Sequence, residues 1–296
     1  MENNTAIFER ERGRLFGLAY RMLGSVADAE DVLQEVCLRW LQQDSDTIAN
    51  PAGWLLTVVT RECIDWQRSA RHRREHYVGV WLPEPLLESF HDTVDGPQAM
   101  TELANNLTLA FLHLLEKLNP LERAVLLLRQ AFDWPFSDIA ATLGKTEAHC
   151  RQLFKRAQEK IGGDIAMTRP DANAERLLLQ FMQTCTSGDF SGLLNCLHED
   201  LIAYSDGGGK VRSLLRPIAG SERVARFLRR IIQPRANLTV IARLINGEPG
   251  LLAFENGQPV AALIFAFREQ KLWRLYSIRN PDKLTGALFD QQSGEQ

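Results

Sequence analysis

The sequence DWPFSDIAATLGKTEAHCRQLFKRAQEKI, residues 133–161, predicts two helices around a tight turn. Gly144 can adopt the left-handed conformation that ends a first helix, and Thr146 can cap the start of a second. Apolar residues recur at helical spacing and predict one buried face on each helix: Phe136, Ile139, Ala140 and Leu143 in the first, and Ala148, Leu153, Ala157 and Ile161 in the second.

The outward side of the second predicted helix carries basic and amide side chains: Arg151, Gln152, Lys155 and Arg156. A helix-turn-helix that reads DNA has this layout, with one face packed on the first helix and a polar face toward the major groove. An ordinary helical hairpin with a solvated basic face is the alternative interpretation.

The composition indicates a globular protein with more than one domain. The chain has 296 residues, of which 45% are hydrophobic and 24% charged. Because the net charge is only -3, any nucleic-acid surface must be local, and basic residues do cluster within 61–74 and 145–160. Five scattered cysteines without a CxxC pair predict reduced thiols and no metal site. With no apolar signal core and no membrane-spanning run, we expect a cytoplasmic protein with no membrane partner.

Residues 6–75 predict a helical domain whose second helix has two contrasting faces. The apolar face is predicted to be buried and contains Val32, Leu33, Val36, Cys37, Trp40 and Leu41. The opposite side is an acidic stripe with a neighbouring amide, namely Asp28, Asp31, Gln34 and Glu35. Such a stripe is most often solvated surface. A docking face for a basic partner surface is the functional alternative.

The next predicted helix, residues 50–74, begins at Asn50-Pro51 and ends in arginines. These are Arg61, Arg68, Arg71, Arg73 and Arg74. Cations near a helix C-terminus also stabilise the helix dipole, so part of this charge has a structural explanation. The number of arginines exceeds that need and favours contact with nucleic-acid phosphates, which position a protein without reading sequence.

Residues 76–100 contain several prolines and predict a connector between two domains. Trp81, Leu82 and Leu86 are too apolar for an idle linker, so we expect another part of the chain to cover them. Residues 101–132 predict two further helices, which form a four-helix domain together with the helix-turn-helix.

The remaining sequence predicts an α+β domain. Helices are expected over 174–185, 190–197 and 222–232, the last one capped by Ser221, and strands over 201–206, 211–220 and four segments from residue 237 onward. Asn256-Gly257 predicts a hairpin turn between two of these strands.

Three motifs, taken in this order, resemble the extracytoplasmic-function sigma factors of bacterial RNA polymerase. They are DAEDVLQEVCLRW (28–40), NPAGWLLTVVTRECIDWQRSARHRR (50–74) and LNPLERAVLLLRQAFDWPFSDIAATLGKTEAHCRQLFKRAQEKI (118–161). The resemblance implies two all-α domains, sigma region 2 and a helix-turn-helix region 4. It implies binding of promoter DNA and of core RNA polymerase through the clamp helices of its largest subunit.

The resemblance also implies roles for individual residues. Polymerase docking would use Asp28, Asp31, Gln34 and Glu35. Contact with the promoter -10 element would use Arg61, Arg68, Arg71, Arg73 and Arg74. Recognition of the -35 element would use Thr146, Arg151, Gln152, Lys155 and Arg156.

The C-terminal part resembles the SnoaL-like members of the NTF2-like superfamily, which are cone-shaped α+β domains. The motifs WLPEP (81–85), DGGGK (206–210) and NPDKL (280–284) extend the resemblance to the sigma subgroup called ECF41. We expect these motifs to form one regulatory interface, made of Trp81, Leu82, Pro83, Asp206, Gly207, Gly208, Gly209, Lys210, Asn280, Pro281, Asp282, Lys283 and Leu284.

These patterns predict region 2 over 1–75, a linker over 76–100, region 4 over 101–165 and a SnoaL-like domain with a tail over 166–296. The predicted function is promoter-specific transcription initiation, controlled by the C-terminal domain, without catalysis, cofactor or metal. One alternative is a cyclase or isomerase that uses Asp206 as acid or base, with Tyr204, Trp273 and Tyr276 lining a pocket. Another is a helix-turn-helix repressor that senses a small-molecule ligand. Asp206 could also simply begin a turn.

Overall fold

The computed structural model describes residues 3–75, 77–88, 108–162, 173–187, 189–231 and 237–285. The chain divides into two compact units. The N-terminal unit comprises residues 1–75, 95–105 and 111–166, and the C-terminal unit comprises residues 76–94, 106–110 and 167–296. The segment predicted as a linker therefore groups largely with the C-terminal unit.

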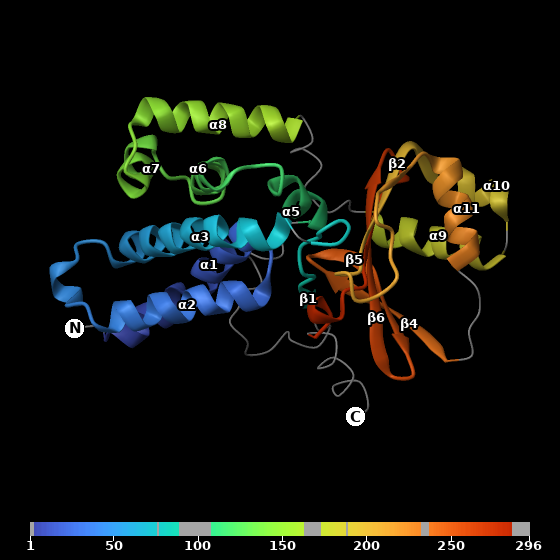
Figure 1. Ribbon diagram of the computed structural model, residues 1–296, viewed down its shortest axis with the longest axis horizontal. Coiled ribbons are helices and arrows are strands. Elements are labelled where there is room, and N and C mark those ends of the chain that lie inside the picture. The colour runs from blue at the N-terminus through green and yellow to red at the C-terminus, as the bar shows by residue number, and fades with distance from the viewer. Residues whose placement is uncertain are drawn as a thin grey trace. The chain divides into compact units, whose positions relative to one another are not determined.

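The described part of the N-terminal unit is helical (Figure 1). Its helices are α1 (Asn4–Leu23), α2 (Val26–Leu41), the 3-10 helix η1 (Ser45–Thr47), α3 (Pro51–Glu75), α6 (Pro120–Gln130), α7 (Phe136–Leu143) and α8 (Glu147–Ile161), while α5 (Leu109–Leu115) spans the boundary between the units. Leu15, Val36 and Leu55 are fully buried where α1, α2 and α3 pack. Trp40 packs on Trp54 with 5.3 Å between ring centroids.

The predicted helix-turn-helix is present as α7 and α8. Gly144 ends α7 with a left-handed φ of 61°, and the hydroxyl of Thr146 accepts a hydrogen bond from the N–H of His149. Both predicted end signals are confirmed. The predicted buried stripe is wrong at Ala148, which is exposed. Cys150 is fully buried instead, because it continues the helical spacing of the other buried residues of α8.

The C-terminal unit is built on one mixed sheet, with strand order β1-β4-β5-β6-β7-β2-β3. The strands are β1 (Leu87–Glu88), β2 (Leu197–Asp206), β3 (Ile218–Ala219), β4 (Leu238–Ile245), β5 (Glu248–Glu255), β6 (Gln258–Arg268) and β7 (Lys271–Ile278). β2 and β7 are parallel, and the other pairs are antiparallel. The expected strand over 211–220 is reduced to β3, which pairs with β2.

Helices α9 (Ala174–Ser187), α10 (Phe190–Asn195) and α11 (Ser221–Ile231) lie on one side of this sheet (Figure 1). Their apolar residues form a core with one face of the sheet, as with Phe181 on Phe265, whose ring centroids are 5.5 Å apart. The predicted α+β class, with helices covering a mixed sheet as expected of an NTF2-like domain, is confirmed.

Two hairpins of the sheet turn on Asn-Gly pairs. Asn256 and Gly257, with φ of 53° and 77°, join β5 to β6, so the predicted turn is confirmed. Asn246 and Gly247 have φ of 53° and 74° and join β4 to β5 in the same way. Both residues of each turn have positive φ, as expected of the type I′ turns that such pairs favour.

Candidate functional site

Asp206, the last residue of β2, lies fully buried and is surrounded by donors. Its Oδ1 atom accepts hydrogen bonds from the Tyr77 hydroxyl at 2.5 Å and the Gly208 N–H at 3.0 Å. Its Oδ2 atom accepts from the Leu82 N–H at 2.9 Å and from the Lys283 ammonium at 2.8 Å. One carboxylate therefore joins the linker, the glycine-rich loop and the C-terminal tail.

Lys283 makes a second set of contacts to the linker. Its ammonium donates to the backbone carbonyl of Leu82 and lies 4.0 Å from the centroid of the Trp81 ring. A desolvated cation over an indole face is a favourable cation–π geometry. Burial, reinforced by the hydrogen bond to Asp206, raises the pKa of the Tyr77 phenol, so Tyr77 stays a neutral donor at physiological pH.

Asn280 orders the tail around the same carboxylate. Its N–H donates to the backbone carbonyl of Asp206 at 2.9 Å, and its side-chain amide donates to the Tyr77 hydroxyl at 3.1 Å. Its Oδ1 atom caps the 3-10 turn η3 (Pro281–Lys283), which presents Lys283 to Asp206. Leu284 follows with 2% of its surface exposed and anchors the tail.

The glycine loop lets the backbones of these segments approach closely. A Cβ atom on Gly208, whose φ is +62°, would lie 2.5 Å from the Asn280 side chain. A Cβ atom on Gly209 would lie 3.2 Å from the Val78 Cβ. At the rim, Lys210 forms an exposed ion pair with Asp282 at 2.6 Å. The three predicted interface motifs thus lie together in the C-terminal unit. We refer to this cluster of Tyr77, Trp81, Leu82, Asp206, Asn280 and Lys283 as the linker clamp.

Two residues of this arrangement escaped the sequence predictions. Tyr77 precedes the WLPEP motif and carried no periodic or motif signal. Asn246 exchanges hydrogen bonds with Leu86: its Oδ1 accepts from the Leu86 N–H at 3.1 Å, and its N–H donates to the Leu86 carbonyl at 2.8 Å. The Asn246-Gly247 pair is a turn signal that could have been recognised in the sequence. Its contact with Leu86 of the linker could not have been recognised there. These bonds lead the linker into β1, which pairs with β4 at the edge of the sheet.

Asp206 is badly placed for acid–base catalysis. A general acid or base must reach a substrate, and this carboxylate has no exposed surface. Tyr204 stacks on Tyr276 at 5.4 Å, while Trp273 and Tyr276 are 5% and 2% exposed. The hydrogen bonds of Asp206 to Tyr77, Leu82 and Lys283 therefore give its carboxylate a structural role.

The acidic stripe of α2 lies at the surface of the N-terminal unit. Asp31, Gln34 and Glu35 are exposed, and Asp28 is half-buried. Glu35 pairs with Arg39 at 3.1 Å. The predicted apolar face is wrong at its end, because Leu41 is 47% exposed, as is Leu38 at 54%. Leu41 lies at the edge of the apolar face, whereas Leu38 lies within the stripe, seven residues after Asp31 and three after Glu35.

The α8 residues predicted to read DNA are exposed. Arg151 pairs with Glu147 at 2.9 Å and lies 5.0 Å from the Phe136 ring centroid. Arg156 is 3.8 Å from the buried Glu122. Gln152 and Lys155 complete this face, and Thr146 serves as the helix cap.

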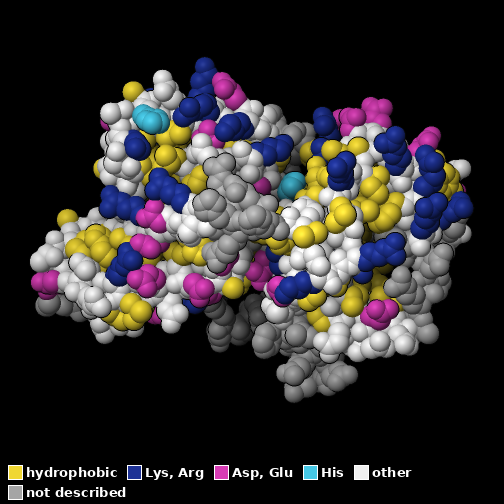
Figure 2. All heavy atoms as spheres, in the orientation of Figure 1, with side chains coloured by type: hydrophobic (Ala, Val, Ile, Leu, Met, Phe, Trp, Pro, Cys, Tyr) yellow, Lys and Arg dark blue, Asp and Glu magenta, His cyan; other side chains and the backbone are white. Residues whose placement is uncertain are grey.

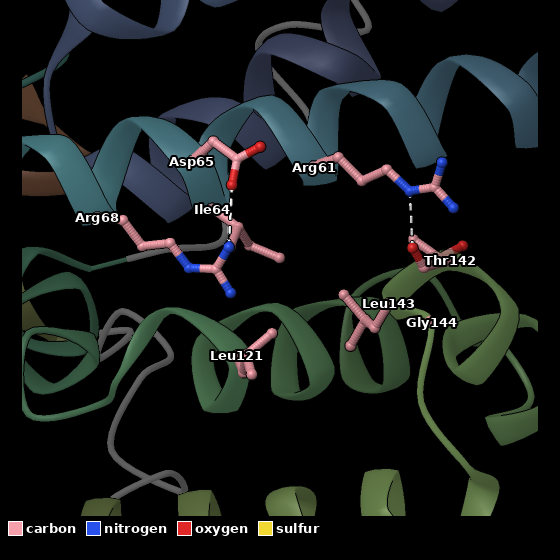
Figure 3. Close-up of a pocket in the computed structure, with 8 residues that line it drawn as sticks. All are labelled: Arg61, Ile64, Asp65, Arg68, Leu121, Thr142, Leu143 and Gly144. Atoms are coloured by element: carbon pink, nitrogen blue, oxygen red, sulfur yellow. Dashed lines mark hydrogen bonds and ion pairs between the residues drawn. The ribbon is translucent and has the colours of Figure 1, made fainter.

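The described arginines of α3, Arg61 and Arg68, line a cleft beside α6 and α7. Arg61 Nε donates to the carbonyl of Thr142 at 2.8 Å, and the Thr57 and Thr142 hydroxyls are 3.0 Å apart. Arg68 pairs with Asp65, and Figure 3 shows them beside a cleft of about 300 Å³ between α3 and the α6–α7 pair. The side chains of Arg71, Arg73 and Arg74 lie outside the described residues.

None of the helices in the described part of the chain is long and apolar enough to cross a membrane. Within the same residues, no group of three or more His, Cys, Asp or Glu side chains is arranged to hold a metal ion.

Comparison with known families matches both helical parts of the chain. Residues 7–73 match Sigma-70 region 2, and residues 108–161 match Sigma-70 region 4. These ranges contain the acidic stripe, the α3 arginines up to Arg73 and the helix-turn-helix.

Relatives extend the similarity over the whole chain. The ECF RNA polymerase sigma factor SigJ of Mycobacterium tuberculosis is 37% identical over 300 residues, covering 97% of this chain and 95% of SigJ. The probable ECF sigma factor SigI of that organism is 31% identical, covering 95% and 94%. The crystal structure of SigJ aligns with a TM-score of 0.78 at 31% identity, covering 95% of this chain and 98% of SigJ. The chain therefore belongs to the ECF RNA polymerase sigma factors, with a C-terminal α+β unit as part of the matched length.

Proposed function

We propose that the C-terminal unit controls this sigma factor by holding the linker between regions 2 and 4. The observation that carries the proposal is the buried Asp206 carboxylate, which accepts from Tyr77, Leu82 and Lys283 at 2.5–2.9 Å. The family matches end at residue 73 and resume at residue 108, so the clamped segment joins the two sigma domains. Holding the linker limits the separation those domains can reach.

Packing within the N-terminal unit supports the same proposal. Arg61 donates to the Thr142 carbonyl, so a helix proposed to lie along the -10 element contacts the first helix of the -35 reader. The names of the -35 and -10 elements place them about 25 base pairs apart, roughly 85 Å at 3.4 Å per base pair. Domains in direct contact cannot occupy both sites. Polymerase binding must separate them, and the linker must then leave the clamp.

The surfaces that act after separation follow from exposure and charge. We assign polymerase docking to the α2 stripe, where Asp31 and Glu35 adjoin the exposed Leu38. Charged residues around apolar contacts steer association and fix its register. We assign -35 recognition to Arg151, Gln152, Lys155 and Arg156 of α8. Arg61 and Arg68 are assigned to the -10 DNA once α3 is released.

Run-off transcription with purified core polymerase tests the proposal. Lys283→Met removes the buried cation of the clamp, whereas Lys210→Met removes an exposed pair at its rim and serves as the matched control. We expect Lys283→Met, and truncation after Arg279, to raise transcription, while Lys210→Met stays near wild type. If neither clamp variant changes transcription while circular dichroism shows a folded protein, the C-terminal unit is not a control element.

A further inference from the structure

A strongly basic segment begins at Lys210, at the rim of the clamp, and continues into α11, whose basic face belongs to none of the surfaces assigned so far. Residues 210–230 contain seven Lys and Arg residues and one Glu. This stretch therefore carries a formal charge of +6 in a chain whose net charge is -3. A local charge of this kind creates a positive field that attracts polyanions even when the whole protein is acidic.

Helix α11 concentrates this charge on one face. Val224, Ala225 and Leu228 are buried in the core beneath the helix. Arg223, Arg226 and Arg230, at i, i+3 and i+7, lie on the opposite face and are exposed. Figure 2 shows Lys and Arg side chains gathered over the part of the C-terminal unit where α11 lies in Figure 1.

Helix stability accounts for only part of this charge. Arg229 and Arg230 lie in the last turn, where cations interact favourably with the helix dipole. Arg223 lies in the first turn, where a cation opposes that dipole. Arg226 is 3.5 Å from Glu222, but both side chains are more than 60% exposed, and such a pair contributes little.

The chemistry of the face matches a phosphate backbone. Arginine forks bind phosphate bidentately, and lysine is absent from α11. Seven residues of helix span about 10 Å, which matches two to three phosphates of a DNA strand that rises 3.4 Å per nucleotide. Among the described side chains of α11, no large apolar group is exposed to anchor a protein partner. The helix also has no Asn or Gln that could read base edges.

We propose that Arg223, Arg226 and Arg230 bind the sugar–phosphate backbone of duplex DNA independently of sequence. The C-terminal unit would then add affinity for DNA to a sigma factor whose base recognition lies elsewhere. This proposal does not depend on the linker clamp, because the α11 face and the clamp share no residue.

Salt-dependent DNA binding by the full chain tests the proposal. The probe is a fluorescently labelled duplex of arbitrary sequence, titrated at 50–300 mM salt and followed by anisotropy. Arg223→Gln, Arg226→Gln and Arg230→Gln are combined in one variant. The control combines Arg176→Gln, Arg268→Gln and Lys271→Gln, which removes the same charge from other elements of the C-terminal unit. Circular dichroism checks the folding of both.

Each lost phosphate contact makes the plot of log K against log salt shallower by about 0.9. We therefore expect the α11 variant to reduce the slope by about 2 to 3 and to bind at least tenfold more weakly at 100 mM salt. The control should keep the wild-type slope. Arg151→Ala in both backgrounds should leave this difference unchanged, because α8 lies in the other unit. A wild-type slope in the α11 variant, or equal loss in the control, would overturn the proposal and leave α11 as a solvated face or a site for an acidic protein.

Discussion

The Nζ atom of Lys283 lies 2.8 Å from Oδ2 of Asp206, and the two side chains are 10% and 0% exposed. Two charges buried together depend on each other, because removing one leaves the other without compensation in a poorly solvated site. The Lys210–Asp282 pair of the same loop and tail is 55% and 60% exposed. The two pairs therefore provide a natural comparison within one interface.

Lys283→Met should lower the free energy of unfolding of the C-terminal unit by ~3–5 kcal/mol, the usual cost of breaking a buried pair. Lys210→Met should change it by at most about 1 kcal/mol. Urea denaturation gives both values. Amide exchange at residues 81–87 should also rise in the Lys283 variant. Equal effects of the two substitutions would mean that burial of the Asp206 pair is not what holds the linker.

Glu248 makes stability depend on pH. Burial raises its pKa from 4.5 to about 8, although a hydrogen bond from the Leu109 N–H opposes the shift. Because the folded state keeps this proton longer than the unfolded state, stability is full below about pH 4.5, falls as pH rises toward about 8 and then levels. Glu248→Gln should flatten this dependence and raise the thermal midpoint at pH 8. The 74% exposed Glu269 supplies the control, Glu269→Gln, and an unchanged pH profile in the Glu248 variant would contradict the account.

Arg151→Ala should weaken recognition of the -35 element by about 1–3 kcal/mol, the usual cost of a lost base contact. The promoter can be selected with holoenzyme from a randomised duplex library. Arg10 on α1 is 56% exposed against 57% for Arg151, so Arg10→Ala is a matched control. Core polymerase affinity should stay unchanged in both. Loss of polymerase affinity in the Arg151 variant would point to misfolding.

Asp31→Lys with Glu35→Lys should weaken binding to core polymerase, most strongly at low salt. The difference in polymerase affinity between the variant and the wild type should shrink at high salt, because the Debye length falls from ≈ 10 Å at 0.1 M to 3 Å at 1 M. The control is Glu9→Lys with Asp46→Lys, which makes the same charge change at other exposed positions of the N-terminal unit and should keep wild-type affinity. Wild-type affinity in the first variant would identify the stripe as solvated surface.

Local signals in the sequence predicted local structure well. Gly144, Thr146 and Asn256-Gly257 fix the backbone through their own conformational preferences, so their turns could be predicted without a partner. The exposure of Leu41 could not, because helical spacing identifies a face but not which end of it neighbouring helices cover. The contact of Arg61 with Thr142 could not be predicted either, because the two residues are far apart in sequence. An arginine at this position is equally compatible with binding DNA and with a contact inside the protein. Tyr77 was missed for a related reason, since its role depends on Asp206 in another segment.

A reversible crosslink between the linker and the glycine loop tests whether the linker must leave the clamp before transcription can start. A Cβ atom on Gly209 would lie 3.2 Å from the Val78 Cβ, close to the 3.5–4.5 Å of natural disulfides. Val78→Cys with Gly209→Cys should form a bond on mild oxidation that closes the clamp, and Gly209→Cys alone controls for the oxidant and for the left-handed backbone. The measurement is run-off transcription by the double variant with core polymerase, before and after reduction with dithiothreitol. We expect transcription near background when the bond is closed and recovery to the level of the single variant when it is opened; equal transcription from the oxidised and reduced protein would show that linker release does not control initiation.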